Sequence, residues 1–278
     1  MIYKASYDYL LQMLPEKITE QRLQDYFVGD SQDFLSLRDV FVQFIHSAQN
    51  YQRMPNVIKF DQRKEDMSDV LCDYDFYKIK DMDVDELYQI LRKRYNIGGK
   101  DSKQNSWYKW SKSVVDAAKF MSEFKDVEDF KLFVDRFSYN FSTRMALPLL
   151  IEKKISGIGF ALACDSLKEL GYLDYPKPDV HIKEVFYQIG VAEKDDIAVF
   201  EVIDKMATEC KEIDRKVSPY KIDKILWLIC SGKFYKDDIS IGQHRDELIQ
   251  YIKEARVKFL WENKKWKAPD SCVRIEVD

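Results

Sequence analysis

Two glycines separated by a single residue stand between two predicted helices near the middle of the chain. Gly157 and Gly159 flank Ile158, with apolar residues at helical spacing before and after them. Glycine allows a sharp backbone turn and a close approach to a partner. A helix that starts at such a turn has free backbone N–H groups, which can donate to a DNA phosphate without a cationic side chain. The same pattern also fits a plain turn between two helices, so the hairpin alone does not define a function.

A carboxylate and an imidazole follow the second of these helices. Asp179 precedes Val180, His181 and Ile182, an order typical of an aspartate that caps the start of a helix. A helix N-terminus favours an ionised carboxylate by about 0.3–1 kcal/mol. Asp179 is therefore a candidate both for capping and for chemistry.

Taken together, the hairpin, the helix after it and the aspartate resemble the helix-hairpin-helix (endonuclease III-like) DNA glycosylase superfamily. The signature of that superfamily is a Leu-Pro-Gly-Val-Gly hairpin, a helix, and Val-Asp-x-His-Val at the start of the next helix. Gly157, Gly159, Asp179 and His181 match this signature at about the right separation.

Two further segments extend the resemblance to about residues 34–235. Phe44–Asn50 is similar to the Leu-Ser-Ala-Gln segment near the start of the family's core, and Asp223–Gly232 is similar to its final core helix. The iron–sulfur loop of many members is absent, because no cluster of four cysteines follows Gly232. Residues 61–104 would be an extra segment within the family's fold.

The resemblance implies a role for each matching residue. Asp179 would stabilise the oxocarbenium character of the sugar and direct a water molecule, while His181 would support the loop structurally. Backbone groups of the hairpin would bind DNA, Gln49 would fill the gap left by a flipped base, and aromatic side chains would form the base pocket. The DNA contacts are then Gly157, Ile158, Gly159, Lys153, Lys154 and Gln49, and the best pocket candidates are Trp107, Phe160 and Trp227. No cofactor or metal is implied, except for a monovalent cation on the carbonyls of Ile155 and Ile158.

One position departs from the family pattern. Bifunctional members carry a lysine two residues after the second glycine, and this lysine attacks the sugar as an amine. Here that position is Ala161. The resemblance then implies a monofunctional glycosylase that leaves an abasic site, or an inactive relative. An amine from elsewhere in the chain is a further alternative, and its candidates are Lys153, Lys154, Lys177 and Lys183.

The elements that must position these residues are mostly helices. Apolar residues recur at three and four in most of the chain from Phe34 to Val257, which predicts an all-α fold. The resemblance adds a two-lobed arrangement around a cleft, with the hairpin and Asp179 at its mouth. The expected organisation is an N-terminal lobe over 1–104 with an acidic insertion at about 61–104, and a core over 105–235 with the hairpin motif at about 147–170. A C-terminal helix and tail over 236–278 would pack on the N-terminal lobe.

Signals for other structure are few. The best strand candidates are Val57–Phe60 and Cys272–Val277, and the glycine-rich polar run Asn96–Gln104 predicts a loop. Gly171 and Gly190 lie where helix C-caps are expected, and Ser218-Pro219 is typical of a helix start.

Composition limits the class of protein. The 278 residues are 46% hydrophobic, which is ample for a core, and the five scattered cysteines argue against a disulfide framework or a zinc site. Without an apolar run long enough for a membrane span or a signal-peptide pattern, we expect a cytoplasmic protein, and we expect a monomer.

The uneven distribution of charge bears on the partner. Residues 1–90 hold 10 Lys/Arg and 17 Asp/Glu, whereas residues 91–154 hold 14 and 8, and residues 251–267 hold 6 and 2. The two basic zones could form one side of the protein that faces phosphates. An ordinary helical surface with many solvent-exposed ion pairs has the same composition.

The sequence thus predicts a DNA glycosylase that acts on a damaged or modified base in duplex DNA by base flipping. The alternative is a non-catalytic helix-hairpin-helix DNA-binding protein, which Ala161 and the acidic balance favour. A third interpretation is a helical module whose acidic N-terminal residues bind a basic protein, and it predicts no salt-dependent affinity for DNA.

Overall fold

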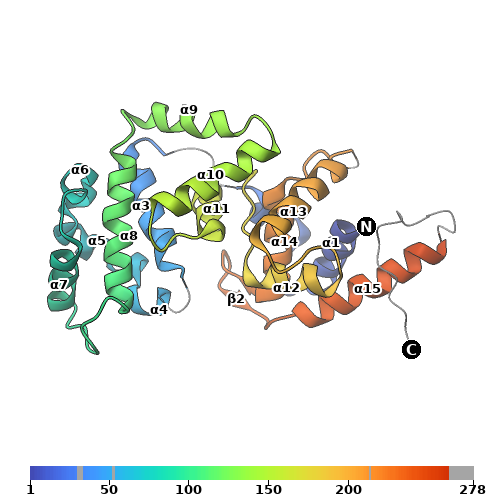
Figure 1. Ribbon diagram of the computed structural model, residues 1–278. Coiled ribbons are helices and arrows are strands. Elements are labelled where there is room, and N and C mark those ends of the chain that lie inside the picture. The colour runs from blue at the N-terminus through green and yellow to red at the C-terminus, as the bar shows by residue number, and fades with distance from the viewer. Residues whose placement is uncertain (30–33, 52–53, 213, 263–278) are drawn as a thin grey trace.

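The computed structural model describes residues 1–29, 34–51, 54–212 and 214–262, and most of these residues are helical (Figure 1). The first elements are α1 (Ile2–Gln12), α2 (Glu20–Phe27), α3 (Leu37–Gln49), α4 (Pro55–Ile58), α5 (Phe60–Val70), η1 (Cys72–Tyr74), α6 (Phe76–Ile79), α7 (Val84–Arg94) and α8 (Ser106–Met121). They are followed by α9 (Val127–Phe137), α10 (Phe141–Lys154), α11 (Phe160–Glu169), α12 (Val180–Gln188), α13 (Asp196–Cys210), α14 (Pro219–Ser231), β1 (Lys233–Phe234), β2 (Ile239–Ser240) and α15 (Arg245–Glu262). The all-α prediction is confirmed for this part of the chain.

Two hydrophobic cores divide the described residues into two lobes. The first lobe comprises residues 34–175, and its core is built from α3 to α11. The second lobe comprises residues 1–28 and 180–256, and its core is built from α1, α2 and α12 to α15. Figure 1 shows the two groups of helices side by side, with α10 and α11 near the junction.

Helix α13 of the second lobe contacts the first lobe. Phe200 of α13 is fully buried in the core of the first lobe, where its ring packs against Phe160 and Tyr175. Nearby, Arg144 of α10 forms an ion pair with Asp204 of α13 at 2.5 Å. These contacts fix α11, which carries the hairpin, against the second lobe.

The cores divide the chain differently from the expected organisation into 1–104, 105–235 and 236–278. Helices α3 to α7 share one core with α8, so no boundary falls at residue 104. Helices α12 to α14 pack with α1 and α2 rather than with the hairpin. The last helix, α15, contacts α1, α12 and α14.

Local signals at helix ends act as predicted. Ser218 caps α14 by accepting a hydrogen bond from the Lys221 amide, and Pro219 occupies the first turn. Gly171 and Gly190 follow α11 and α12 with φ values of +86° and +70°, in the left-handed region that favours glycine.

The strand predicted for Val57–Phe60 is wrong, because these residues form α4 and the start of α5. Pro55 opens α4, and both Ile58 and Phe60 point into the core of the first lobe. The strand predicted for Cys272–Val277 lies outside the described residues. The short pair that does form, β1 with β2, is antiparallel and matches Lys233 with Ser240.

The acidic region 61–104, predicted as an insertion, is largely helical. It holds most of α5, then η1, α6 and α7, and these helices contribute to the core of the first lobe. The loop predicted for Asn96–Gln104 does follow α7. The N-terminal helices α1 and α2 were not identified from the sequence.

Candidate functional site

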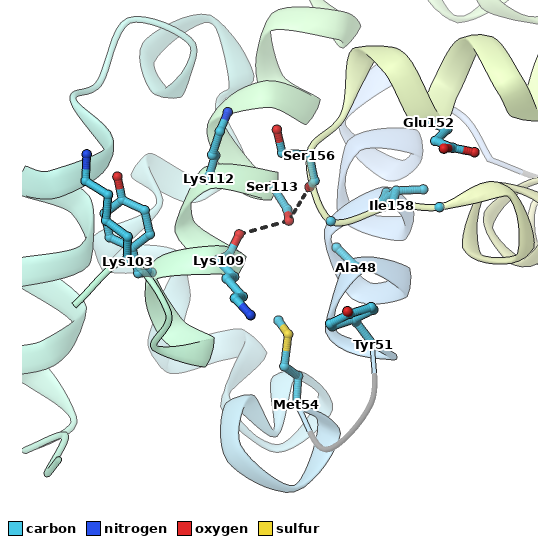
Figure 2. A pocket seen from close by; sticks show the side chains of 13 residues that line it. Ala48, Tyr51, Met54, Lys103, Lys109, Lys112, Ser113, Glu152, Ser156 and Ile158 are labelled. Carbon is cyan, nitrogen blue, oxygen red and sulfur yellow. Dashed lines mark hydrogen bonds between the residues drawn. The ribbon is translucent and has the colours of Figure 1, made fainter. Parts of the chain in front are cut away.

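The glycine hairpin joins α10 to α11 and rests on α8. Gly157 has a φ of +83°, and a Cβ at this position would lie 2.6 Å from the Ser113 hydroxyl. That hydroxyl lies 2.6 Å from the Ser156 carbonyl oxygen and 3.0 Å from the Lys109 carbonyl oxygen (Figure 2). The Ser156 amide donates to Asp116 at 3.1 Å. Ser113 and Asp116 of α8 thus hold the turn in place, and only glycine fits at Gly157.

The start of α11 is open. Gly159 is its N-cap residue, with extended backbone angles, and no side chain caps the helix. Gly159 is exposed, and a Cβ there would have no atom within 4 Å. The first-turn N–H groups of α11 and the positive end of its dipole are therefore accessible to an anion.

A groove of about 450 Å³ lies beside the hairpin, between α8 and the end of α3 (Figure 2). Three lysines line it, namely Lys103, Lys109 and Lys112. Lys112 pairs with Asp116 at 2.9 Å, whereas the structure records no ion pair for Lys103 or Lys109 among the described residues. Glu152 also lines the groove, but the three lysines outnumber this one carboxylate, so the excess positive charge suits a phosphate backbone.

The lysines predicted for this role lie elsewhere. Lys153 is 80% exposed and lies 3.9 Å from Glu152, which lines the groove, and Lys154 pairs with Glu123 at 2.7 Å. Neither side chain lines the groove. The signal that could have identified Lys109 and Lys112 is the excess of basic residues over 91–154, read together with the helical periodicity of α8.

Asp179 caps α12, as the sequence predicted. Its Oδ1 accepts hydrogen bonds from the amides of His181 at 2.9 Å and Ile182 at 3.0 Å. Burial raises the pKa of Asp179, and the negative charge of Asp223 raises it further, while the Ile182 amide opposes both. Among the described residues, no hydrogen bond to Oδ2 is recorded, so this oxygen is available for other chemistry.

A second cavity, of about 560 Å³, lies where the two lobes meet, and we call it the interlobe pocket. The first lobe supplies residues of α3 and α11 and the second supplies residues of α14, β1 and the β1–β2 turn. Its lining residues are Gln43, His46, Ser47, Asn50, Pro55, Asp165, Lys168, Glu169, Lys177, Asp223, Lys224, Trp227, Lys233 and Tyr235. Asp179 is not itself among the lining residues, but it follows the lining residue Lys177 by two positions and is close enough to Asp223 for their charges to interact.

Four charged residues form a network in the wall of this pocket. Lys168 Nζ lies 2.9 Å from Asp223 and 3.4 Å from Asp165, and Lys177 Nζ lies 3.0 Å from Asp165. The backbone amide of Lys177 also donates to Asp223 at 2.9 Å. Asp223 thereby holds the loop that leads to Asp179.

The network is charged at neutral pH. Burial alone would raise the pKa of Asp165, but the ammonium groups of Lys177 and Lys168 lower it well below its ordinary value. Burial would likewise lower the pKa of Lys168, but Asp223 and Asp165 raise it above its ordinary value. Lys168 is thus held as an ammonium ion, which is not a nucleophile.

The prediction that Gln49 fills the gap left by a flipped base is not compatible with its position. Gln49 is only 3% exposed, and its Oε1 accepts a hydrogen bond from the Phe60 amide at 2.9 Å. The side chain therefore completes the start of α5 instead of facing a ligand. Its neighbour Asn50 lines the interlobe pocket.

The three aromatic residues predicted to form the base pocket lie in different parts of the structure. Trp107 is buried in the first core against Tyr95, and Phe160 is buried against Phe200, so neither is a wall of the interlobe pocket. Trp227 does line it. The His181 ring has a buried Nδ1 without a hydrogen-bond partner in the described structure, and the hydrogen bond recorded between His181 and Asp179 comes from the His181 backbone amide.

Sequence reasoning missed Asp165, Lys168 and Asp223. The spacing of Ala161, Asp165 and Lys168, at four and then three residues, places them on one face of α11. Charged residues within the apolar helix α14 were a second available signal. Ala161 itself is half-buried in the first turn of α11.

Of the lysines considered as substitute amines, only Lys177 lines the interlobe pocket. Lys183 pairs with Asp196 at 2.5 Å. Within the described ranges, no group of three or more His, Cys, Asp or Glu side chains is arranged to hold a metal ion. The described helices also include none with the length and apolar character needed to cross a membrane.

Comparison of the chain with protein-family models, with curated proteins and with solved structures finds no match.

Proposed function

We propose that the protein is a monofunctional DNA glycosylase of the helix-hairpin-helix type, which excises a damaged or modified base from duplex DNA. The observation that supports this most is the placement of α11. Its first turn, with Gly159, borders the lysine-lined groove, while Asp165 and Lys168 near its other end line the interlobe pocket beside Asp179. At 1.5 Å per residue the two ends of α11 are only about 14 Å apart.

In this proposal the DNA backbone lies along the hairpin. A phosphate accepts hydrogen bonds from the open amides at the start of α11, and Lys109 and Lys103 add positive charge. The target nucleotide leaves the stack, and its base enters the interlobe pocket, where Trp227 offers an aromatic face.

The chemistry is assigned to Asp179. As the base departs, the sugar becomes positively charged, and the ionised carboxylate stabilises that charge and orients a water molecule. Because Ala161 offers no amine, the product is an abasic site in an unbroken strand. The hairpin-bound monovalent cation that the family resemblance implies stays a prediction.

The experiment that tests this is base release from DNA that carries oxidised, alkylated, deaminated or naturally modified bases. Freed bases are identified by mass spectrometry, and parallel samples are treated with alkali. The proposal predicts a freed base, with strand breaks only after alkali. Breaks without alkali would indicate an amine nucleophile, for which Lys177 is the first candidate to replace.

Ala161 specifically favours a second candidate, a DNA-binding protein that keeps the hairpin without catalysis. It predicts steeply salt-dependent DNA affinity and no freed base from any substrate. If affinity for DNA is absent or does not depend on salt, both candidates are wrong and a protein-binding module becomes the better interpretation.

A further inference from the structure

One face of α3 forms a wall of the interlobe pocket. Gln43, His46, Ser47 and Asn50, spaced at three and four residues, all line it. Among these residue types, histidine is the one that most often transfers protons in catalysis. A departing base needs a proton, and Asp179, which acts here as an ionised carboxylate, is not the group to supply it.

Asp61 of α5 holds the His46 ring. Asp61 Oδ1 lies 3.1 Å from His46 Nε2, and Oδ2 lies 3.3 Å from it. An ionised carboxylate only accepts hydrogen bonds, so Nε2 carries a proton. Phe60 also contacts the imidazole, with ring centroids 6.0 Å apart. Asp61 is not among the lining residues, so it orients the ring without occupying the space for a ligand.

A second contact already fixes the start of α5 to α3. Gln49, one turn after His46, is buried and accepts a hydrogen bond from the Phe60 amide at 2.9 Å. His46 differs from Gln49 because it lines the pocket and its side chain is 31% exposed. A histidine that lines a pocket and is oriented by a carboxylate is the usual arrangement of a group that transfers a proton.

We propose that His46 is the general acid of base release and that Asp61 positions it. The bond between the sugar C1′ and the base nitrogen breaks, and its electron pair stays with the base. In the imidazolium form of His46, Asp61 holds the Nε2 proton and the Nδ1 proton passes to the base. A water molecule bonds to C1′ and gives a proton to Asp179, and solvent carries a proton back to His46.

This inference rests on the proposed function, because it takes the interlobe pocket to be the site of the flipped base. A general acid matters most for a base that leaves poorly. A base with an electron-withdrawing fluorine leaves more easily as an anion and depends less on the proton. Loss of His46 should therefore slow release of the ordinary base more than release of its fluorinated analogue, whereas purely structural damage would slow both equally.

The test measures single-turnover release of a base that the wild type excises and of the fluorinated analogue of that base. General acids typically contribute about 10²–10⁴-fold, so we expect His46→Gln to slow the ordinary base by about 100-fold or more and the analogue by about 10-fold or less. Asp61→Asn should show the same preference with a smaller loss, because an acceptor for Nε2 remains. Asp179→Asn should slow both bases to a similar extent, because its charge acts on the sugar.

Two further variants are the controls. His244→Gln removes a half-buried histidine outside the pocket lining, and we expect both rates to be unchanged. Glu169→Gln removes a carboxyl group that lines the same pocket. A loss that depends on the leaving base in Glu169→Gln but not in His46→Gln would assign the proton to Glu169 and overturn the inference. Circular dichroism, thermal unfolding and affinity for undamaged duplex establish that each variant folds and binds.

The outcomes distinguish a failure of this inference from a failure of the proposed function. If the wild type releases a base and His46→Gln releases it as fast, or slows both bases equally, His46 is not the general acid and the glycosylase assignment stands. If the wild type releases no base from any duplex, the proposed function fails, and this inference fails as well.

Discussion

Asp179 caps α12 through one carboxylate oxygen, and the chemical role that we propose for it uses the other. Oδ1 caps α12 through two backbone amides, and Oδ2 has no hydrogen bond recorded among the described residues. The cap was evident from the sequence, because an aspartate before a helical run is a strong local signal. The raised pKa was not, because it depends on burial and on Asp223, which is 44 positions further along the chain.

The direction of this pKa shift predicts how base release depends on pH. Only ionised Asp179 stabilises a cationic sugar, so the rate should rise with pH through a midpoint above 3.8, the ordinary aspartate value. The contribution of Asp179 to the free energy of unfolding changes with pH in the opposite direction. Because the pKa is raised in the folded state, the stability contributed by the protonated form is lost as pH rises through that midpoint.

The measurement is the single-turnover rate of base release across the acidic range, with the free energy of unfolding followed in parallel. A release rate that is independent of pH throughout this range would contradict the role given to Asp179.

The two glycines of the hairpin differ in whether their positions leave room for a side chain. Gly157→Ala places a side chain at positive φ and against Ser113, so we expect a loss of about 1–3 kcal/mol in stability. Gly159→Ala meets no atom within 4 Å, so stability should change little. Its methyl group would, however, stand beside the open amides of α11 and weaken DNA binding.

Thermal unfolding and DNA affinity at one fixed salt concentration distinguish these effects. If Gly159→Ala binds DNA as tightly as the wild type, the start of α11 is not the phosphate site.

Helical periodicity was sufficient to predict α3 and α8 to α15, but short apolar runs were not informative. Val57–Phe60 has the composition of a strand, yet Pro55 starts a helix and the Phe60 amide bonds to Gln49 instead of to a neighbouring strand. The same contact buries Gln49, which the family resemblance had assigned to the gap left by a flipped base. Tertiary contacts of this kind cannot be read from local sequence.

The interlobe pocket exists only while the two lobes keep their relative positions, because its walls come from both of them. Phe200→Ala removes the buried ring that α13 inserts into the core of the first lobe, and it should lower the free energy of unfolding by about 3–5 kcal/mol. Because the pocket walls come from both lobes, base release per folded molecule should fall as well.

Phe130→Ala is the appropriate comparison, because Phe130 is equally buried but lies on α9, within the first lobe and outside the pocket lining. It should destabilise the protein without changing release per folded molecule. Equal rates for the two variants at equal folded fraction would show that Phe200 does not maintain the pocket.

The two-lobed arrangement was expected from the family resemblance, but its boundaries were not. The second lobe is assembled from both ends of the chain, since α1 and α2 pack with α12 to α15. Neither composition nor charge along the sequence indicates that the two ends of the chain pack together. Residues that pack together but lie far apart in the chain leave no local pattern in the sequence.

A comparison of two asparagine variants decides whether Asp179 acts on the sugar or only caps a helix. Asparagine caps helices nearly as well as aspartate does, so Asp179→Asn should keep the fold while removing the charge. Asp195→Asn is the matched control, because Asp195 caps α13 through two amides in the same way, at 2.9 Å each. With a substrate that the wild type cleaves, we predict that base release falls about 100-fold or more in Asp179→Asn, with DNA affinity retained, and is unchanged in Asp195→Asn. Undiminished release by a folded Asp179→Asn variant would contradict the account.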